Sequence, residues 1–357
     1  MICEYPDYYE KFHCIGGSCP DTCCAGWEVD VDEESLNYYK SLEGPFGDRL
    51  RSHLKEENDE VYFPLTKENR CPFLNKSNLC DIYIELGEES LCQVCTEYPR
   101  YFMDVGNYEQ IDMSLSCMEL GRIFFSDPGP VHYIRSENDV LGEELAPEEE
   151  NELVHVLALR NEAIEILQET PARPHTEQLK DVISLVEDAV SLDPSVSILE
   201  GEEANVLSAA YHHRNAAFIS ETADDLLQLM TKLEVLDERW TNELDKLGKC
   251  AETDFNEQLK LFKKTLGSQG EHWFRRLSVY FVYRYFIDAS MDGDLMRSLR
   301  ILIRSLRIIL RMAVLRFKEQ GGSFTQMDMA DVCHLYSKEV EHSDDNVEII
   351  KAPFDKG

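Results

Sequence analysis

FHCIGGSCPDTCCAGW (residues 12–27) is the densest cysteine segment of the chain and contains Cys14, Cys19, Cys23 and Cys24. Ten of the twelve cysteines lie within the first 120 residues. Thiols this close along a chain form disulfides or hold a metal together. The N-terminus has no apolar run and no small-residue cleavage site, so we expect no secretory signal and a cytoplasmic protein with reduced thiols. Metal ligands are therefore favoured over a disulfide framework.

Nine cysteines in the first third of the chain are candidate metal ligands. They are Cys14, Cys19, Cys23, Cys24, Cys71, Cys80, Cys92, Cys95 and Cys117. Four thiolates can hold an iron–sulfur cluster or a zinc ion, so nine are more than one such centre needs. Some of the nine are then structural, or there are two centres. The adjacent Cys23 and Cys24 could bridge two metals, or one of them could be catalytic.

The composition narrows the classes of partner. Acidic residues outnumber basic ones by 69 to 35, which gives a formal charge of −34. Such a chain is poorly suited to duplex nucleic acid, whose phosphates require Lys and Arg. The most apolar stretch, residues 301–317, carries four arginines that would be costly inside a bilayer. We therefore expect a globular protein with no nucleic-acid partner and no membrane span, whose acidity favours solubility or a basic partner.

The chain divides into a Cys-rich first third and a helical remainder. Residues 1–125 show little helical periodicity and predict an irregular region that needs cross-links or a metal for stability. Turn residues and an acidic run predict a linker at residues 126–150. From residue 151 to 357, apolar residues recur at helical spacing. The predicted fold is mainly α, with a small Cys-rich, irregular, metal-binding N-terminal region packed on a C-terminal bundle of several helices.

The helical remainder shows individual helices and their ends. The periodicity predicts helices at residues 151–169, 176–192, 203–236, 238–249, 254–266, 271–289, 294–319 and 326–341. Thr325 and Asp328 predict a capping box, and Asp292-Gly293 predicts a turn between two long helices. Arginines spaced by three and four share one helix face: Arg297, Arg300, Arg304, Arg307 and Arg311. We expect this face to meet acidic helices of the same protein or of a second copy, with docking to an acidic partner as the alternative.

The motifs of the first third resemble those of the flagellin lysine-N-methylase family, which is related to a wider group of zinc- or iron-chelating proteins with a C-C pair. The resemblance lies in F-x-C-I-G-x-x-C-x-D-T-C-C-x-G-W (12–27), C-P-F-L (71–74), L-C-D-I-Y (79–83), L-G-E (86–88), C-x-x-Y-P-R (95–100) and L-S-C (115–117). These motifs occur in the family's order, whereas the helical remainder is similar only in character. The chain departs from the family pattern at Met118-Glu119, where the family has Pro-Glu, and in the additional Cys92.

The resemblance implies an enzyme that binds a [4Fe-4S] cluster, uses S-adenosyl-L-methionine and methylates the ε-amine of lysines on flagellin before export. No G-x-G-x-x-G loop is present, so a Rossmann methyltransferase is not expected. Arg100 is the candidate for pairing with a carboxylate of the donor or substrate. Trp27 is expected in the core, or stacked on adenine. Candidates for removing the amine proton are Asp21, Glu97, Tyr98 and Glu119.

Other functions remain open beside the methyltransferase. The first is a non-catalytic zinc- or iron-chelating protein, in which the cysteine region is structural and the helical domain binds a partner. In that case zinc is the alternative metal. A further possibility is a metal chaperone or a different cluster enzyme. A brown, iron-containing protein would disfavour a purely zinc-bound site.

Overall fold

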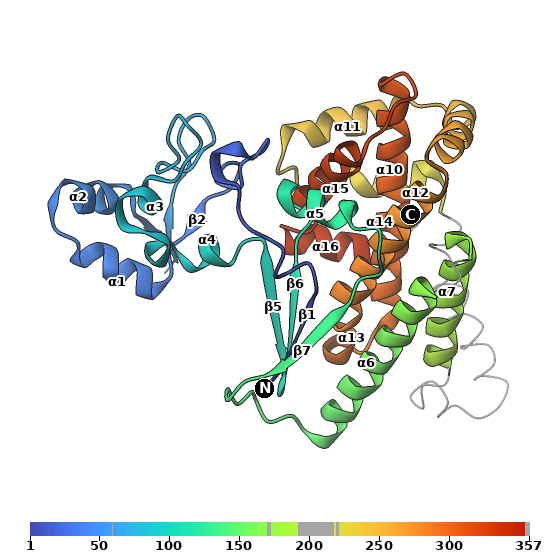
Figure 1. Cartoon of the computed structure of the whole chain (residues 1–357), viewed down its shortest axis with the longest axis horizontal. Coiled ribbons are helices and arrows are strands. Elements are labelled where there is room, and N and C mark those ends of the chain that lie inside the picture. Colours follow the sequence, from blue (N-terminus) through green and yellow to red (C-terminus); the bar gives the residue numbers. More distant parts are fainter. Residues whose placement is uncertain (59, 170–172, 192–217, 219–220, 354–357) are drawn as a thin grey trace.

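The computed structural model describes residues 1–58, 60–169, 173–191, 218 and 221–353. Figure 1 shows a large helical body and a smaller lobe that projects from one side of it. We call residues 24–97 the lobe and the rest of the described chain the body. The predicted mainly α class is confirmed, with a few strands in the N-terminal region. Among the described residues, no helix is both long enough and apolar enough to cross a lipid bilayer.

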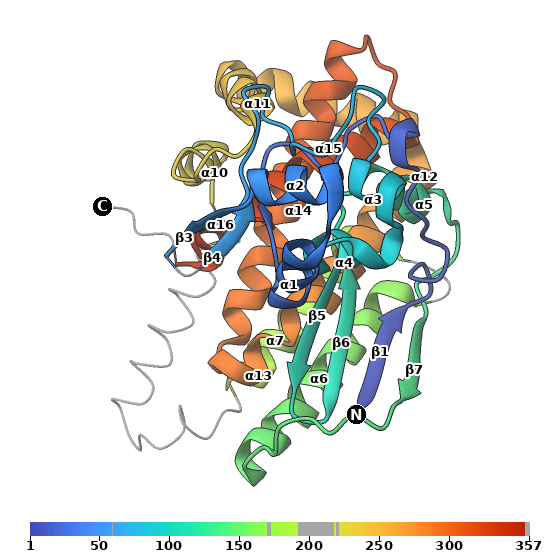
Figure 2. The same ribbon diagram turned by 90° about the vertical axis from the view of Figure 1, so that its left-hand side faces the viewer.

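A four-stranded sheet lies beside the helices of the body, and the N-terminus is at the end of its strand β1. Its strands are β1 (Ile2–Pro6), β5 (Arg100–Val105), β6 (Tyr108–Met113) and β7 (Tyr133–Glu137). Their order is β5-β6-β1-β7, which Figure 2 shows side by side. β1 runs parallel to β6, and the other two pairs are antiparallel. β7 lies within residues 126–150, the predicted linker, so this segment closes one edge of the sheet.

The body's helices follow the sequence periodicity closely. They are α5 (Met118–Ser126), α6 (Pro147–Gln168), α7 (His175–Ser191), α10 (Ala223–Met230), α11 (Glu238–Lys249), α12 (Glu252–Phe286), α13 (Ala289–Asp292), α14 (Leu295–Glu319), α15 (Gln326–Val340) and α16 (Asp344–Lys351). Much of the predicted helix 203–236 lies outside the described residues; of its described end, α10 is helical, and the prediction is wrong for residues 231–236. The predicted capping box of α15 is present, and Gly293 adopts φ +69° at the turn before α14.

The two longest helices form the centre of the body. α12 and α14 pack along each other, and the large core includes Trp273 and Tyr280 from α12 with Leu302 and Ile308 from α14. Inside α12, Gly267 has φ +51° and ψ −130°, which interrupts the helix between its two predicted parts, 254–266 and 271–289. Burial of these apolar side chains, at roughly 25 cal/mol per Å², is the main force that holds the bundle together.

The predicted arginine face of α14 meets carboxylates and carbonyls of the same chain. Arg304, fully buried, pairs with Glu221, and its Nη1 donates to the carbonyls of Ile350 and Ala352, each at 2.6 Å. Arg311 pairs with Glu252 at 2.8 Å. The expectation of contact with acidic residues of the same protein is confirmed, and these arginines are not available for docking a partner.

The lobe has its own small core. Short helices surround a three-stranded sheet: α1 (Glu33–Ser41), α2 (Gly44–His53), α3 (Asp81–Leu86), α4 (Gln93–Glu97), β2 (Val29–Asp30), β3 (Lys55–Glu57) and β4 (Glu60–Phe63). Tyr39, Leu50, Phe63 and Phe73 are buried at its centre. The N-terminal third is thus less irregular than its sequence indicates, because these elements are too short to show a period.

Candidate functional site

The nine candidate ligands are free thiols and occupy the lobe and its junction with the body. Cys80, Cys92 and Cys117 immediately precede α3, α4 and α5. The loop that carries the first four cysteines joins the body to the lobe. In this arrangement the nine thiols fall into two groups, which meet at the adjacent pair Cys23 and Cys24.

The first group, the lobe thiols, consists of Cys24, Cys71, Cys80, Cys92 and Cys95. The segments of Cys24 and Cys71 pair antiparallel through Ala25 and Arg70, and the Cys71 amide donates to the Cys24 carbonyl at 2.9 Å. The first four of these cysteines belong to, or pack against, the lobe core. Burial raises the pKa of Cys71 to about 12, and the thiols that raise it further are Cys24, Cys80 and Cys92.

The remaining lobe thiol, Cys95, is tied to Cys92. A hydrogen bond between the two thiols lowers the pKa of Cys92 and raises that of Cys95. The Tyr39 hydroxyl also lies 3.5 Å from the Cys92 sulfur, inside the lobe core. The charges of Cys24 and Cys71 also act on Cys95, while Cys80 interacts with Cys24 and Cys71.

The second group, the junction thiols, consists of Cys14, Cys19, Cys23 and Cys117. The pKa of Cys23 is raised first by its hydrogen bond with Cys24 and by burial, and then by the charges of Cys14 and Cys117. Burial raises the pKa of Cys117 to about 12, with contributions from Cys19 and Cys14. The hydrogen bond from Cys23 lowers the pKa of Cys24 to about 7. The C-C pair therefore places one thiol in each group.

The donor set fits a thiolate-bound metal centre in its chemistry, because its nine members are free thiols and several of them shift one another's pKa values. Within the described part of the chain, however, no three His, Cys, Asp or Glu side chains stand ready to hold a metal ion. Metal binding by the Cys-rich region therefore stays a prediction. Much of the connecting loop at residues 12–28 is irregular, so its thiols can approach a bound centre without breaking a long helix or strand.

A network of polar side chains lies beside the junction thiols. The Ser116 hydroxyl, next to Cys117 in sequence, lies 3.0 Å from the Tyr98 hydroxyl and 2.6 Å from His342 Nε2. Trp27 packs against the His342 ring, with 4.5 Å between ring centroids. Burial lowers the pKa of His342 to about 3, so its ring is neutral near pH 7. Trp27 comes from the lobe, Tyr98 precedes β5, Ser116 follows β6, and His342 lies between α15 and α16. They meet at the junction.

A second histidine fixes the cysteine loop to the body. His334 of α15 has its Nδ1 2.6 Å from the Ser116 carbonyl and its Nε2 2.7 Å from Asp21 Oδ2. Arg239 donates to the same Asp21 oxygen at 2.9 Å. Burial alone would raise the pKa of Asp21. The hydrogen bond with His334 and the nearby cations Lys338 and Arg239 outweigh burial and lower this pKa to about 2. Asp21 is therefore an anchor of the loop and a poor proton acceptor.

Arg100, the predicted partner of a carboxylate, lies at the start of β5. Its guanidinium stacks over the rings of Tyr9 and Phe12, at 4.9 Å and 5.5 Å from their centroids. Its Nη1 donates to the Glu97 carbonyl at 3.5 Å, and its buried Nε has no hydrogen-bond partner. Among the described residues it forms no ion pair. Arg100 lies two residues after Tyr98, and its unpartnered guanidinium nitrogen is available to a carboxylate from outside the chain.

The other candidates for proton removal differ in their surroundings. Glu119 is held by Arg122 through two hydrogen bonds of 2.6 Å and 2.7 Å. Glu97 is half-buried and accepts a hydrogen bond from Gln93 on α4. Tyr98 is half-buried, and loss of solvent around its hydroxyl raises its pKa well above the usual value. Of the four candidates, Tyr98 is the one that joins the network beside the junction thiols.

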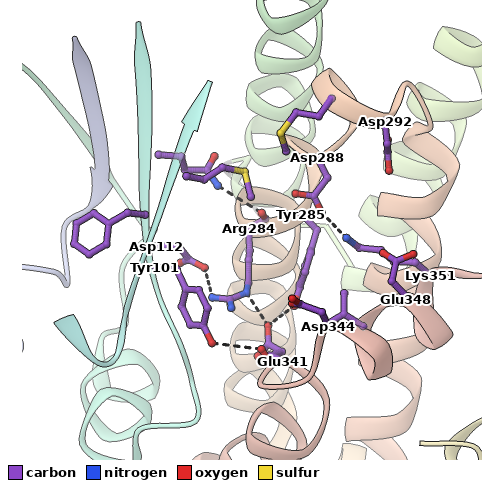
Figure 3. Close-up of a pocket in the computed structure, with 15 residues that line it drawn as sticks. Tyr101, Asp112, Arg284, Tyr285, Asp288, Asp292, Glu341, Asp344, Glu348 and Lys351 are labelled. Atoms are coloured by element: carbon purple, nitrogen blue, oxygen red, sulfur yellow. Dashed lines mark hydrogen bonds and ion pairs between the residues drawn. The ribbon is translucent and has the colours of Figure 1, made fainter. Parts of the chain in front are cut away.

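A pocket of about 380 Å³ opens between the sheet and the last helices, on the far side of His342. Tyr101 on its wall lies 3.4 Å, hydroxyl to Nδ1, from His342. Figure 3 shows Arg284 between Asp112 on the strand side and Glu341 on the helix side. The Arg284 guanidinium donates to Asp112 at 2.8 Å and approaches Glu341 at 3.0 Å.

Sequence reasoning did not find the histidines or the pocket. Ser116 and His342 are 226 residues apart, and Ser116 and His334 are 218 apart. No local spacing signals such a contact, because the fold alone brings these residues together. The cysteines, in contrast, stand out in the sequence because they lie close together along the chain.

One family model matches the helical part of the chain, and curated relatives match about a third of the chain. The family model described as "FliB lysine N-methylase C-terminal domain" matches residues 155–357. A lysine-N-methylase of Salmonella typhimurium (strain LT2) is 29% identical over 130 residues, covering 34% of this chain and 32% of that protein. A lysine-N-methylase of Salmonella choleraesuis has the same identity and coverage.

A third relative is shorter. The flagellar biosynthetic protein FliU of Salmonella muenchen is 28% identical over 130 residues, covering 34% of this chain and 76% of that protein. The matched part of this chain spans about a third of the length of the two relatives named lysine-N-methylase. No solved structure matches the chain.

Proposed function

The chain belongs to the FliB family of flagellin lysine N-methylases, and from this premise we propose that it transfers methyl groups to the ε-amines of lysines on flagellin. The observation that carries the proposal is the family match over residues 155–357, more than half of the chain. The relatives named lysine-N-methylase support the reaction, and the flagellar name of the third supports the substrate. We place the reaction in the cytoplasm, where thiols stay reduced.

The junction thiols are the proposed ligands of a [4Fe-4S] cluster, and S-adenosyl-L-methionine is the proposed donor. Cys14, Cys19, Cys23 and Cys117 supply the four sulfurs that such a cluster commonly takes. When bound, the cluster would supply an iron site in an anionic surrounding, and the donor would supply the methyl group. Support comes from the grouping of these thiols beside the polar network.

Arg100 is proposed to hold a carboxylate of the donor. A guanidinium binds a carboxylate through charge-assisted hydrogen bonds, and it can present two parallel donors. The buried, unpartnered Nε of Arg100 supports this role, because a buried donor without an acceptor is costly. Stacking on Tyr9 and Phe12 keeps the guanidinium in place. Phe12 is two residues before Cys14, so Arg100 contacts the segment that leads to the first junction thiol.

The polar network at the junction is proposed to orient the neutral amine of the lysine. The ammonium form has no lone pair, and its usual pKa is about 10.4, so its proton must leave before methyl transfer. His342 is neutral and bound to Ser116, which in turn lies beside Tyr98. With a pKa of about 3, His342 is too weak a base to keep this proton, so the proton is proposed to pass to solvent. The hydroxyls of Ser116 and Tyr98 can then hydrogen-bond the neutral amine.

Methyl transfer to purified flagellin, followed by intact mass, tests the proposal. The wild-type protein, purified without oxygen and mixed with S-adenosyl-L-methionine, should add whole methyl groups to flagellin. Replacement of Cys23 and Cys24 by Ser should abolish bound iron and methyl transfer together. Cys250→Ser is the matched control, because Cys250 lies outside both groups of thiols. Full activity of iron-free wild-type protein would refute the role of the cluster.

A second function, a non-catalytic zinc- or iron-chelating protein, is favoured by one observation. Cys71 and Cys92 are buried in the lobe core, where a bound zinc would serve to hold the lobe together. Metal analysis separates the two functions. Zinc alone, with no iron and no methyl transfer to flagellin, would support the structural function.

A further inference from the structure

We propose that the pocket between the sheet and the last helices binds the side chain of a docking lysine of the protein substrate, distinct from the lysine that is methylated. In Figure 3 its walls come from β5 and β6 on one side and from α12, α13 and α16 on the other. The preference for a cationic side chain with an alkyl stem rests on the lining of the pocket. The choice of lysine among such side chains rests on the proposed function.

The rim and walls of the pocket suit an alkyl stem. Tyr101 and Tyr285 line it, and Met291 is 58% exposed at its edge. Exposed apolar side chains at a pocket gain stability when a ligand covers them. Four methylene groups of a lysine provide such cover, and aromatic rings also attract an ammonium group through their faces.

The pocket is negatively charged after its internal ion pairs are taken into account. Six carboxylates line it, against the two cations Arg284 and Lys351. Arg284 is held by Asp112 and Glu341, and Lys351 pairs with Asp288 at 2.5 Å. The remaining carboxylates are Asp292, Asp344 and Glu348. Asp292 and Glu348 both pair with Arg297, which lies outside the lining. Asp344 forms no ion pair with any described residue. A cation is therefore attracted to this pocket.

A buried carboxylate oxygen provides a second, independent sign of a ligand. Asp112 is 3% exposed, and while its Oδ2 accepts from Arg284, its Oδ1 has no hydrogen bond of good geometry. The Met113 amide also acts on this carboxylate and lowers its pKa against the effect of burial. Burial raises the pKa of Asp112 to about 6, which reflects an incompletely satisfied anion. An ammonium group has three donors and would supply the missing hydrogen bond.

The pocket connects to the junction thiols through hydrogen bonds. Tyr101 on the pocket wall contacts His342, and His342 contacts Ser116, the neighbour of Cys117. A cationic side chain in the pocket is therefore separated from the proposed methyl-transfer site by this short chain of side chains. Binding there would position the substrate segment next to the junction.

Binding of small probes tests the proposal without any need for methyl transfer. The probe is Nα-acetyl-L-lysine methylamide, and the norleucine analogue is its neutral match with a similar stem. Met103 and Met291 line the pocket, so ¹³C-methyl NMR of the full chain reports on it directly. We expect the lysine probe, and not the norleucine probe, to shift these two signals. Unchanged Met103 and Met291 signals, or equal shifts with the arginine analogue, would overturn the assignment to lysine.

Two neighbouring aspartates provide a matched pair of variants. Asp344 and Asp345 both begin α16 and are both exposed, but Asp344 alone of the two lines the pocket. Asp344→Asn should weaken probe binding about two- to fivefold, as expected for a partly exposed ion pair, while Asp345→Asn leaves it unchanged. Asp112→Asn should weaken it roughly tenfold or more, if the variant keeps the wild-type fold. Equal effects of Asp344→Asn and Asp345→Asn would refute the site.

The outcome is separable from the proposed function. If the probes bind as expected and flagellin is not methylated, the pocket stands and the proposed function fails. If flagellin is methylated and Asp344→Asn leaves its KM unchanged, the proposed function stands and the pocket does not bind a docking lysine.

Discussion

A single buried guanidinium joins the first strand of the protein to its first long helix. Arg160 on α6 is fully buried, pairs with Glu4 of β1 and donates to the Tyr108 hydroxyl of β6 at 3.0 Å. Its guanidinium also lies 4.8 Å from the centre of the Tyr283 ring on α12. One residue thus connects the sheet with two helices.

Arg160→Met should destabilise the protein by about 3 kcal/mol, because it leaves the buried Glu4 carboxylate with Arg135 as its one remaining cation. Urea unfolding followed by circular dichroism measures the loss. The double variant with Glu4→Gln should recover part of it, since no buried charge is then left unpaired. A loss below about 1 kcal/mol in the single variant would show that the ion pair is dispensable.

Glu339 on α15 makes stability depend on pH. Its carboxylate accepts from the amides of Leu236 and Asp237, yet burial raises its pKa to about 7. A carboxyl whose pKa is raised on folding contributes stability at low pH, and the contribution is lost as the pH rises through the folded value. For Glu339 the loss falls between about pH 4.5 and pH 7.

Glu339→Gln removes this titration and keeps an acceptor for the two amides. The unfolding free energy of the variant, relative to wild type, should therefore rise between pH 4.5 and pH 7.5, by at most about 3 kcal/mol. Urea unfolding of both proteins at the two pH values measures the difference. A difference that is the same at both values would contradict the raised pKa.

At the residue scale, the sequence indicates the thiols and Arg100 as candidate site residues, but not their polar neighbours. Cys23 and Cys24 are recognisable because they are adjacent in the sequence. His342 is one of ten histidines and follows an ordinary acidic helix end. Its importance comes from Ser116, far away in sequence, and from the Trp27 ring, neither of which a local pattern can indicate.

At the scale of elements, helix ends were predictable where a local signal fixes them. Residues 238–249 were predicted as a helix and α11 has the same bounds, because Asp237 caps its first turn with a hydrogen bond to the Arg239 amide. β6 was not predicted, because five of its six residues are buried. Its apolar and polar side chains therefore do not alternate as they do in a half-exposed strand.

The capping box of α15 gives a test at this scale. Thr325 Oγ1 accepts from the Asp328 amide at 3.3 Å, and Asp328 accepts from the Thr325 amide at 2.6 Å. Thr325→Ala should reduce the unfolding free energy by about 1 kcal/mol, because the first-turn amide loses its acceptor. Thr325→Ser keeps the hydroxyl and should stay close to wild type in the same thermal or urea titration. Equal losses in the two variants would assign the effect to the methyl group.

At the scale of the whole molecule, the N-terminal third is shared between two cores. Tyr8 and Phe12 pack into the large core with the helices, whereas Tyr39 and Phe63 belong to the lobe core. A linear sequence shows one Cys-rich region, because it does not reveal that β5 and β6 return to the body. The division follows from pairing of β1 with β6, which is separated from it by about a hundred residues.

Removal of metal should therefore affect the lobe more than the body. The lobe has a small core, and a small core alone gives little stability. Treatment with a chelator under reducing, oxygen-free conditions should raise amide hydrogen exchange in residues 24–97 and leave α14 protected. Exchange that rises equally in both parts, or in neither, would show that bound metal does not hold the lobe.

The central claim is that the junction thiols hold an iron centre on which lysine methylation depends. It is tested most directly by measuring iron, sulfide and methyl transfer to flagellin on the same oxygen-free preparations of wild type, Cys23→Ser and Cys250→Ser. The account predicts iron, sulfide and transfer in wild type and Cys250→Ser, and the loss of all three in Cys23→Ser. Undiminished methyl transfer by Cys23→Ser protein that contains no iron would contradict it.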